Sequence, residues 1–189
     1  MTVSETKKAL RRACAKTRSD IPISEKRAAD AALCRTVAAH PAFAAADLLL
    51  LFTPVRGEPD LLPLFDEATK RGIPVAFPRC EGTVMTFHTV NAPTDMIPDR
   101  FGIPAPTKNA PAPAVTARTL CVLPGLAAGR DGTRLGYGGG FYDRFLDTFA
   151  GITLFPVYDR LLLDTLPTEP TDHRVMHVIT EKGEISPDA

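Results

Sequence analysis

The stretch TLCVLPGLAAGRDGTRLGYGGGFYDRFLDTF, residues 119–149, carries the clearest structural pattern in this 189-residue chain. It opens with an apolar run, residues 119–125, whose length and composition predict a buried strand. A glycine-rich loop follows as far as Gly140, and the residues from Phe141 to about Phe149 are predicted to form a helix. A strand, a loop and a helix in this order form part of the repeating unit of α/β proteins.

The flanking sequence continues this alternation. Helices are predicted over residues 7–16, from an N-cap at Ser24 to a stop at Pro41, and over residues 60–71, which end at Gly72. Strands are predicted over residues 48–52, 73–78, 85–90, 152–158 and 175–180. The proline-rich residues 91–117 are expected to form an irregular surface connection. We therefore predict one α/β domain over residues 1–189, with a mainly parallel sheet flanked by helices.

Composition and charge narrow the class of protein. The 22 basic residues balance the 22 acidic ones, so the broad positive field of a nucleic-acid-binding protein is not expected. The longest strongly apolar run, residues 48–52, is far shorter than the roughly 20 residues that span a bilayer, and no apolar segment follows the N-terminus MTVSETKK. The four cysteines are widely spaced, which predicts that they are free thiols in a reducing compartment. We therefore expect a cytoplasmic enzyme or binding protein.

The glycine-rich loop has the composition of an anion-binding site. Glycine stands at positions 125, 129, 132, 136, 138 and 139, with Gly140 at the start of the helix. Closely spaced glycines let backbone N–H groups converge on an anion, and a helix N-terminus adds further donors. Arg130 and Arg134 offer guanidinium groups to phosphate. The alternative is a merely flexible loop. Neither the P-loop pattern nor complete Rossmann spacing is present, because Phe141 fills the third glycine position of the latter.

The run RLGYGGGFYDR, from Arg134 to Arg144, resembles the sequence signature of the 5-formyltetrahydrofolate cyclo-ligase (5,10-methenyltetrahydrofolate synthetase) family. Weaker agreements extend the resemblance over most of the chain. They are KKALR at residues 7–11, Gly57-Glu58, FGIP at residues 101–104 and LPTEPTD at residues 166–172. The resemblance implies ATP- and Mg²⁺-dependent cyclisation of 5-formyltetrahydrofolate, and a fold like that of sugar-phosphate isomerases and CoA transferases. It also implies a small-molecule folate substrate, no nucleic-acid or membrane partner, and a monomer or weak homodimer.

The resemblance also assigns roles to single residues. Arg134 is expected to be catalytic and to contact the phosphates of ATP. The other expected ATP-binding residues are Lys7, Arg11, Leu135, Gly136, Tyr137, Gly138, Gly139, Gly140, Phe141 and Tyr142. Thr53 and Glu58 are expected to bind the folate, and Asp143 and Asp172 to bind Mg²⁺, which commonly uses one or two carboxylates together with substrate phosphates.

Without the resemblance, plainer interpretations of several residues stay open. Lys7 and Arg11 could belong to the solvated face of a basic helix, Glu58 could be an exposed loop acid, and Asp172 an ordinary loop residue. His173 and His177 are four apart, which in a strand separates their Cα atoms by roughly 13 Å. We therefore predict that these two histidines do not share a metal ion.

Five residues differ from those usual in the family, namely Ala105, Ala128, Gly129, Leu161 and Thr171. The nucleotide side therefore matches better than the folate side. Three functions stay open: the cyclo-ligase, a relative that uses ATP on another formyl or carboxyl substrate, and a non-catalytic folate- or nucleotide-binding regulator.

Overall fold

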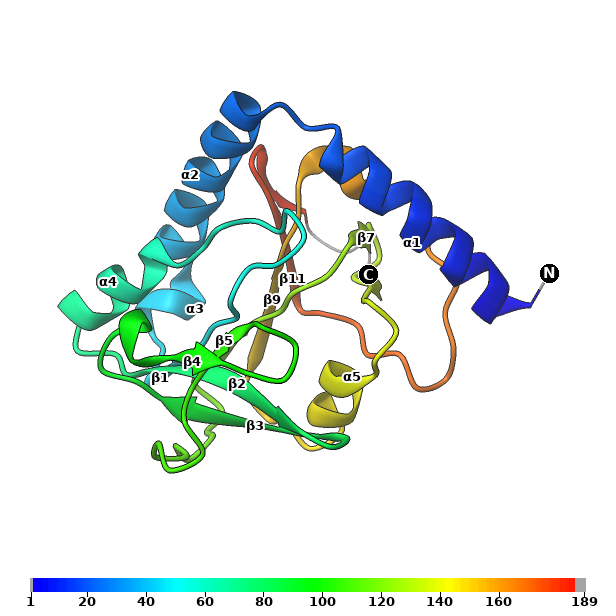
Figure 1. The fold of residues 1–189 in the computed structure, drawn as a ribbon. Helices are drawn as coiled ribbons and strands as arrows, with labels where there is room; N and C mark the ends of the chain where they lie inside the picture. Colours follow the sequence, from blue (N-terminus) through cyan, green and yellow to red (C-terminus); the bar gives the residue numbers. More distant parts are fainter. Residues whose placement is uncertain (1, 186–189) are drawn as a thin grey trace.

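A computed structural model describes residues 2–185 of the chain, and its centre is a seven-stranded mixed sheet (Figure 1). The strands follow the order β12-β11-β9-β6-β1-β2-β3. Their bounds, in chain order, are β1 Leu48–Leu50, β2 Val75–Glu81, β3 Val84–Thr89, β6 Thr119–Val122, β9 Ile152–Pro156, β11 His177–Thr180 and β12 Gly183–Ile185. All pairs from β2 through β1, β6 and β9 to β11 are parallel, and β3 and β12 add antiparallel edges. The predicted α/β class with a mainly parallel sheet is confirmed.

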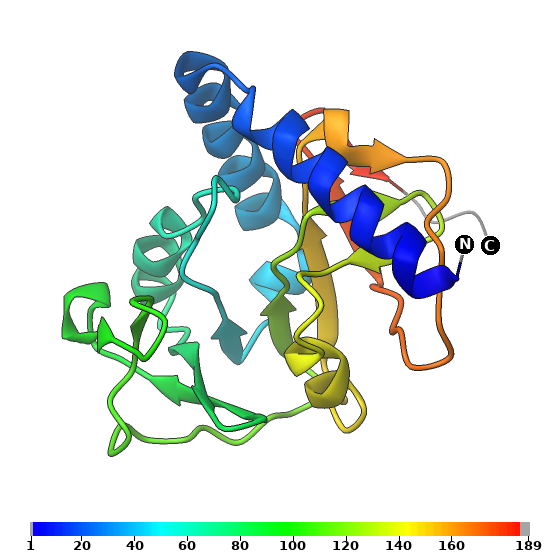
Figure 2. The same ribbon diagram turned by 45° about the vertical axis from the view of Figure 1, so that its right-hand side comes forward.

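Two groups of elements cover the two faces of the sheet (Figures 1 and 2). Helix α2, Ile23–Ala39, packs against β11 and β12, and α4, Pro63–Lys70, packs against β2. Helix α5, Phe141–Leu146, lies on the other face, and α1, Val3–Ser19, contacts the short helix η2, Asp159–Leu161. This division follows from right-handed crossovers, because the chain moves in one direction from β1 to β2 and in the opposite direction from β6 to β9.

The helix ends differ from those predicted. Helix α1 starts earlier than expected, because Thr2 and Glu5 form a capping box. The predicted N-cap at Ser24 is wrong: Pro22 holds the N-cap position of α2, and Ser24 lies within the helix.

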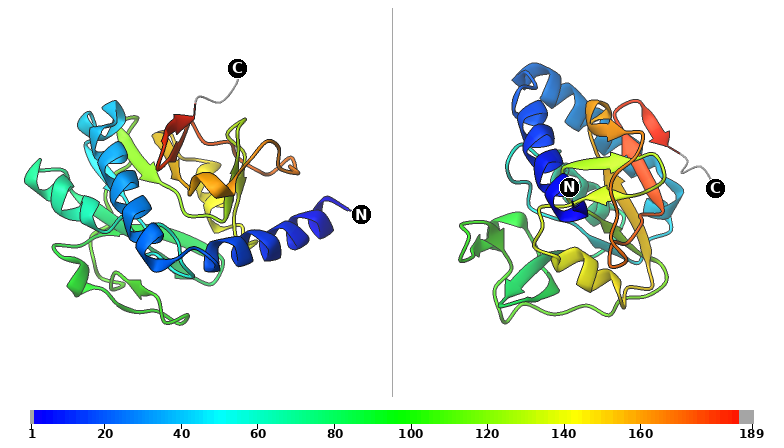
Figure 3. Two further views of the ribbon diagram at one scale, coloured as in Figure 1. Left: turned by 90° about the horizontal axis from the view of Figure 1, so that it is seen from above. Right: turned by 90° about the vertical axis from the view of Figure 1, so that its right-hand side faces the viewer.

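Helices α1 and α2 diverge from the bend between them (Figure 3). After α2, the short helix α3, Pro41–Ala44, begins at once, because the ring of His40 caps it by accepting the Ala42 N–H.

The predicted glycine loop contains ordered structure. Strands β7, Ala127–Gly129, and β8, Arg134–Leu135, form an antiparallel hairpin, and β10, Leu162–Leu163, joins it in a second sheet. Asp131 closes the turn by accepting the N–H and the hydroxyl of Thr133. Only residues 136–140 remain irregular between β8 and α5. The connection over residues 91–117 likewise includes a short helix, η1 (Pro93–Asp95), and the paired strands β4 (Ile97–Pro98) and β5 (Pro104–Ala105).

The sheet topology marks one place for a ligand. The chain leaves β1 toward β2 and leaves the adjacent β6 toward β9, so the connections after these two strands diverge. Such a point leaves a crevice at the carboxyl ends of the strands, where open α/β sheets bind ligands. None of the helices within residues 2–185 is both long and apolar enough to cross a membrane.

Candidate functional site

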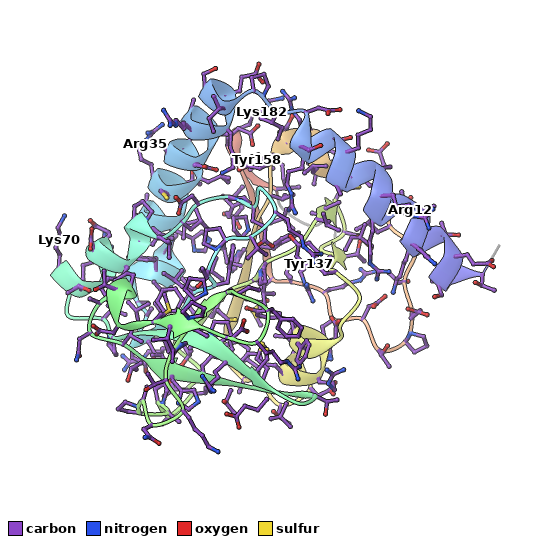
Figure 4. The ribbon with its side chains drawn as sticks, in the orientation of Figure 1. Arg12, Arg35, Lys70, Tyr137, Tyr158 and Lys182 are labelled. Carbon is purple, nitrogen blue, oxygen red and sulfur yellow. The ribbon has the colours of Figure 1, made fainter. Side chains whose placement is uncertain are left out.

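A cavity of about 730 Å³ opens at this divergence of β1 and β6. Its walls come from the segments after β1, after β6 and within β2, and from the loop between β4 and β5. The glycine segment 136–140 and the first turn of α5 close the remaining side. The cavity has a volume typical of sites for small molecules and cofactors. Figure 4 shows Tyr137, which belongs to this wall, in the interior below α1.

The glycine segment presents free backbone donors to this cavity. In the described chain, no backbone carbonyl accepts the N–H groups of residues 136–141, so these amides are left for another acceptor. Gly138 and Gly140 have φ values of +91° and +66°, which side chains with a Cβ rarely adopt. Their conformation turns the segment at the start of α5, where the helix dipole also favours negative charge. The arrangement suits an anion such as a phosphate group.

Arg134 and Asp143 form an ion pair in the wall of the cavity. The Nη2 group of Arg134 donates to Oδ1 of Asp143 over 2.9 Å, and its Nη1 group donates to the carbonyl of Pro124 over 3.0 Å. The Arg134 side chain is only 4% exposed and its Nε has no protein partner. Burial makes this charge costly unless it is fully paired. An anionic ligand beside the amides of the glycine segment would therefore meet a positive charge already held in place.

Lys7 and Asp172 form a second ion pair, and neither residue lines the cavity. The ammonium group of Lys7 donates to Asp172 over 2.5 Å and to Glu169 over 2.7 Å, and the Lys7 side chain is 7% exposed. Burial alone would lower the pKa of Lys7, but the hydrogen bonds and charges of Asp172 and Glu169 raise it above its ordinary value. The two predicted metal ligands, Asp143 and Asp172, therefore belong to separate ion pairs.

Arg11 contacts the glycine segment from outside the cavity. Its Nε donates to the carbonyl of Gly136 over 2.8 Å, and a Cβ at Gly138 would lie 3.3 Å from its guanidinium carbon. Leu135 is a core residue, 2% exposed, that pairs with Ala127 in the hairpin. Both residues therefore support the shape of the segment in this structure.

The two predicted folate contacts both line the cavity but differ in their surroundings. Thr53 donates its hydroxyl to the carbonyl of Pro104, which ties the segment after β1 to strand β5. Glu58 is 2% exposed and accepts the hydroxyl of Tyr137 over 2.7 Å and the N–H of Val55 over 2.9 Å. Burial raises the pKa of Glu58, while these hydrogen bonds and the charge of Arg18 oppose the rise. The alternative interpretation of Glu58 as an exposed loop acid is wrong.

Sequence reasoning missed Arg18, which the structure buries beneath the glycine segment. Its guanidinium donates to the hydroxyl of Tyr137 over 2.7 Å and to the carbonyl of Gly125 over 2.8 Å. It also missed Arg56, a cavity residue with φ +52° whose guanidinium lies 5.5 Å from the centre of the Tyr137 ring. The basic helix α1 contains three arginines, and nothing in the sequence pattern distinguishes Arg18 from Arg11 and Arg12.

His177 lies in a polar cluster without His173. Its Nδ1 is 2.7 Å from Glu184, and its ring centre is 4.5 Å from that of His40. His40, His177 and Glu184 have the ligand types of a metal site. However, Nδ1 of His40 accepts the Ala42 N–H, so the ring proton lies on Nε2, the nitrogen that faces Glu184. We therefore interpret the cluster as a hydrogen-bonded group in this structure. His173 pairs instead with Asp147.

Three of the five departures from the family pattern are buried apolar residues. Ala105, Ala128 and Leu161 are each no more than 2% exposed, and Ala105 also lines the cavity. At Gly129 an added Cβ would lie 2.2 Å from the Thr133 hydroxyl, so glycine is required by the tight turn of the hairpin. Thr171 lies beside Asp172 in a turn.

Known proteins are similar to this chain in sequence and in fold. Residues 3–181 match the model of the 5-formyltetrahydrofolate cyclo-ligase family. The chain is 33% identical to a 5-formyltetrahydrofolate cyclo-ligase of Mycolicibacterium smegmatis over 139 residues, which cover 69% of this chain and 72% of the relative. It is 28% identical to the enzyme of the same name from Escherichia coli over 149 residues, which cover 75% of this chain and 81% of that protein.

A solved structure agrees with these matches. The 5,10-methenyltetrahydrofolate synthetase of Aquifex aeolicus superposes with a TM-score of 0.86 at 27% identity. The superposition covers 97% of this chain and 93% of the other. The arrangement of strands and helices in this chain is therefore similar to that of a solved 5,10-methenyltetrahydrofolate synthetase.

Proposed function

We infer that this chain, which belongs to the 5-formyltetrahydrofolate cyclo-ligase family, catalyses the ATP- and Mg²⁺-dependent ring closure of 5-formyltetrahydrofolate to 5,10-methenyltetrahydrofolate. Membership of the family makes the chain an enzyme of the ligase class in folate metabolism. The observation that carries the proposed reaction is the row of free amides at residues 136–141 beside the buried guanidinium of Arg134, at the edge of one cavity.

The chemistry explains why a phosphate site is needed. A formamide oxygen is a poor leaving group, so transfer of the γ-phosphoryl group of ATP to this oxygen creates a better one and leaves ADP. The neighbouring folate nitrogen then bonds to the formyl carbon and loses its proton, and the carbon–oxygen bond breaks as phosphate departs. Such a reaction asks the protein mainly for positioning and charge neutralisation.

We assign these tasks to residues already described. The amides of residues 136–141 and the guanidinium of Arg134 hold the transferring phosphoryl group. Lys7 and Arg11, which lie on helix α1 one turn apart, approach the distal phosphates when the nucleotide is bound. Thr53 and Glu58, which line the cavity in the segment after β1, contact the folate.

The donor set also suits Mg²⁺, a hard cation that prefers carboxylates and phosphate oxygens. Asp143 lines the cavity and directs one oxygen to Arg134, which leaves its other oxygen for a cation. We propose Asp143 as one ligand of Mg²⁺ and Asp172 as a second. Asp172 would have to release Lys7, its present ion-pair partner, in order to bind the metal. Bound Mg²⁺ would neutralise the charge of the triphosphate.

The decisive experiment mixes purified protein with ATP, Mg²⁺ and 5-formyltetrahydrofolate and follows the near-ultraviolet absorbance of the methenyl product. We expect absorbance to grow in proportion to the ADP released. Binding of both ligands without turnover would support a regulator, and ATP consumption with a different formyl or carboxyl acceptor would support a divergent enzyme.

We further propose that the protein works in the cytoplasm as a monomer or weak homodimer, on small molecules and without a nucleic-acid or membrane partner. All four cysteines are free thiols, as expected in a reducing compartment. Sedimentation at several protein concentrations would test the oligomeric state.

A further inference from the structure

A buried three-residue network connects helix α1 to the cavity. Arg18, near the C-terminal end of α1, is 4% exposed and donates to the hydroxyl of Tyr137. Tyr137 in turn donates that hydroxyl's proton to Oε1 of Glu58 over 2.7 Å. Three segments that are far apart in the sequence are therefore joined by two short hydrogen bonds, one of which involves a charged donor and the other a charged acceptor.

Only two members of this network reach the cavity. Tyr137 and Glu58 line it, whereas Arg18 lies behind Tyr137, with its guanidinium carbon 5.7 Å from the centre of the tyrosine ring. A second bond, from Arg18 to the carbonyl of Gly125, fixes the guanidinium against the segment that follows β6. Arg18 therefore does not line the cavity itself, and its hydrogen-bonded route to a ligand there runs through Tyr137 and Glu58.

A buried arginine needs a reason, because an incompletely paired charge in the interior costs several kcal/mol. Among residues 2–185, the hydrogen-bond partners of the Arg18 guanidinium are a carbonyl and a hydroxyl rather than a carboxylate, and its Nε has no partner. A compensating charge is that of Glu58, to which Arg18 is linked through the hydroxyl of Tyr137. Arg12, six residues earlier on the same helix, is exposed instead. Packing of α1 alone therefore does not explain why an arginine occupies position 18.

We propose that Arg18 is a positioning residue for the folate side of the site: it holds the Tyr137 hydroxyl against Glu58 so that this carboxylate stays charged and faces the substrate. The proposal rests on the proposed function, because it requires Glu58 to contact the folate. A charged carboxylate accepts hydrogen bonds from the amino and N–H groups of a pterin, whereas a neutral carboxyl group would offer its own proton instead.

The charges around Glu58 support this role. Burial raises the pKa of Glu58, and the opposing groups are Tyr137, the N–H of Val55, Arg18 and the backbone at Gly125. Arg56 lies over the Tyr137 ring, and the hydroxyl of Tyr142 is also buried near this wall. Arg18 is the positively charged group among those that lower the pKa of Glu58. Its removal is therefore expected to raise the pKa of Glu58 further.

The test is a set of steady-state measurements from pH 6 to pH 9 with Arg18→Met, Arg18→Lys and Tyr137→Phe. For Arg18→Met we expect the KM for 5-formyltetrahydrofolate to rise about tenfold at pH 7 and to recover as the pH increases. The KM for ATP should change less than twofold, and Arg18→Lys should restore much of the folate affinity. Arg12→Met, a change at an exposed arginine of the same helix, should match the wild type throughout.

A double variant separates positioning from a general structural role. If Arg18 acts through Tyr137, Arg18→Met combined with Tyr137→Phe should raise the folate KM no more than the larger single effect. Multiplied effects, an equal rise in both KM values, or a folate KM with no pH dependence would each overturn the proposal.

If circular dichroism shows that Arg18→Met is unfolded, Arg18→Lys and Tyr137→Phe test the proposal by the same pH comparison. Product formation by the wild type is measured first. Absence of product would contradict the proposed reaction. If the wild type is active, the variants alone decide whether the proposal about Arg18 fails.

Discussion

Several charged side chains in and near the site form ion pairs with one another. Arg134 binds Asp143, and Lys7 binds Asp172 and Glu169. Partial burial explains the pairing, because a charge removed from water needs an opposite charge or a hydrogen-bonding partner. Binding of a nucleotide with its cation would exchange these partners, with the basic groups turning to phosphates and the carboxylates to the cation.

Replacement of Arg134 by alanine should reduce turnover far more than it weakens the fold. The change removes a guanidinium beside the free amides of residues 136–141, and loss of one such preorganised donor commonly reduces kcat by about 100- to 1,000-fold. Thermal unfolding should show a loss of about 1–3 kcal/mol, because Asp143 loses its partner. Arg134→Lys, which keeps the charge, should retain more activity. Unchanged kinetics in the alanine variant would contradict the proposed phosphate site.

Replacement of Asp143 by asparagine should increase the Mg²⁺ concentration needed for half-maximal activity about tenfold or more. Asparagine keeps an oxygen that can accept from Arg134, so the thermal midpoint should change little. The measurement is a Mg²⁺ titration at saturating ATP. Asp147→Asn serves as control, because this exposed carboxylate at the end of α5 pairs with His173 outside the cavity. Superimposable titrations of wild type and Asp143→Asn would show that Asp143 is not a ligand.

The segment from β8 to α5 depends on backbone conformation more than on side chains. Gly138 and Gly140 have positive φ, and the amides between them are free because the chain turns too tightly to form regular hydrogen bonds. Strand β8 holds one end of the segment in a hairpin, and helix α5 begins at the other. These two elements hold the irregular residues in place. The irregular segment is therefore shorter than the loop that the glycine content predicted.

A pair of substitutions at Gly140 tests this account. Gly140→Ala should destabilise the protein by about 1 kcal/mol and raise the KM for ATP, because alanine disfavours a φ of +66°. Gly140→Asn should have smaller effects on both, since asparagine tolerates the left-handed region better. Both variants are compared by urea unfolding and by ATP titration of the rate. Equal effects of the two side chains would mean that backbone conformation at position 140 is not the cause.

The cap of helix α3 predicts a pH effect on stability. Burial lowers the pKa of His40, with a further contribution from His177, and Glu184 opposes the change. The folded protein therefore binds this proton less readily than the unfolded chain, whose histidine pKa is about 6.5. Relative to His40→Asn, which keeps a capping oxygen, the wild type should lose stability as the pH falls below about 6.5. Urea unfolding from pH 8 to pH 5 would measure it, and a constant difference between the two proteins would contradict it.

The arrangement of the complete chain brings the site together. Connections that diverge after β1 and β6 leave a crevice, and α1 lies across its outer side with Arg11 and Arg18 reaching the glycine segment and Tyr137. The N-terminal helix therefore supplies contacts to a site that the central sheet creates. Ligands that bind there should stabilise the entire fold, because binding to the native state alone shifts the unfolding equilibrium.

ATP with Mg²⁺ should raise the thermal midpoint of the wild type in a concentration-dependent way. At 100 times the dissociation constant the added stability is about 2.7 kcal/mol. Arg134→Ala should show a much smaller rise at the same nucleotide concentration, because it lacks the guanidinium at the free amides. Differential scanning calorimetry with and without nucleotide measures this. A full nucleotide-dependent rise in Arg134→Ala would place ATP away from Arg134.

Local patterns were sufficient for the main elements and for the glycine segment. The apolar run at residues 48–52 contains the central strand β1, and glycines at positions 138 and 140 have the positive φ that favours this residue. Local patterns failed at the start of α2: Ser24 is a residue type that favours the N-cap, yet the helix begins before it, after Pro22. The hairpin of β7 and β8 was missed because its strands have only three and two residues, too few to show an alternating pattern, and its pairing with β10 joins residues far apart in the chain.

Sequence was enough to establish the α/β class, the family and the glycine-rich segment, because each depends on residues that are neighbours along the chain. Tertiary structure alone decided that Glu58 is buried, that Arg18 reaches it through Tyr137, and that Asp143 and Asp172 belong to different ion pairs. The reason is physical: burial and charge pairing are set by groups brought together from distant segments, and their free energies depend on that three-dimensional neighbourhood.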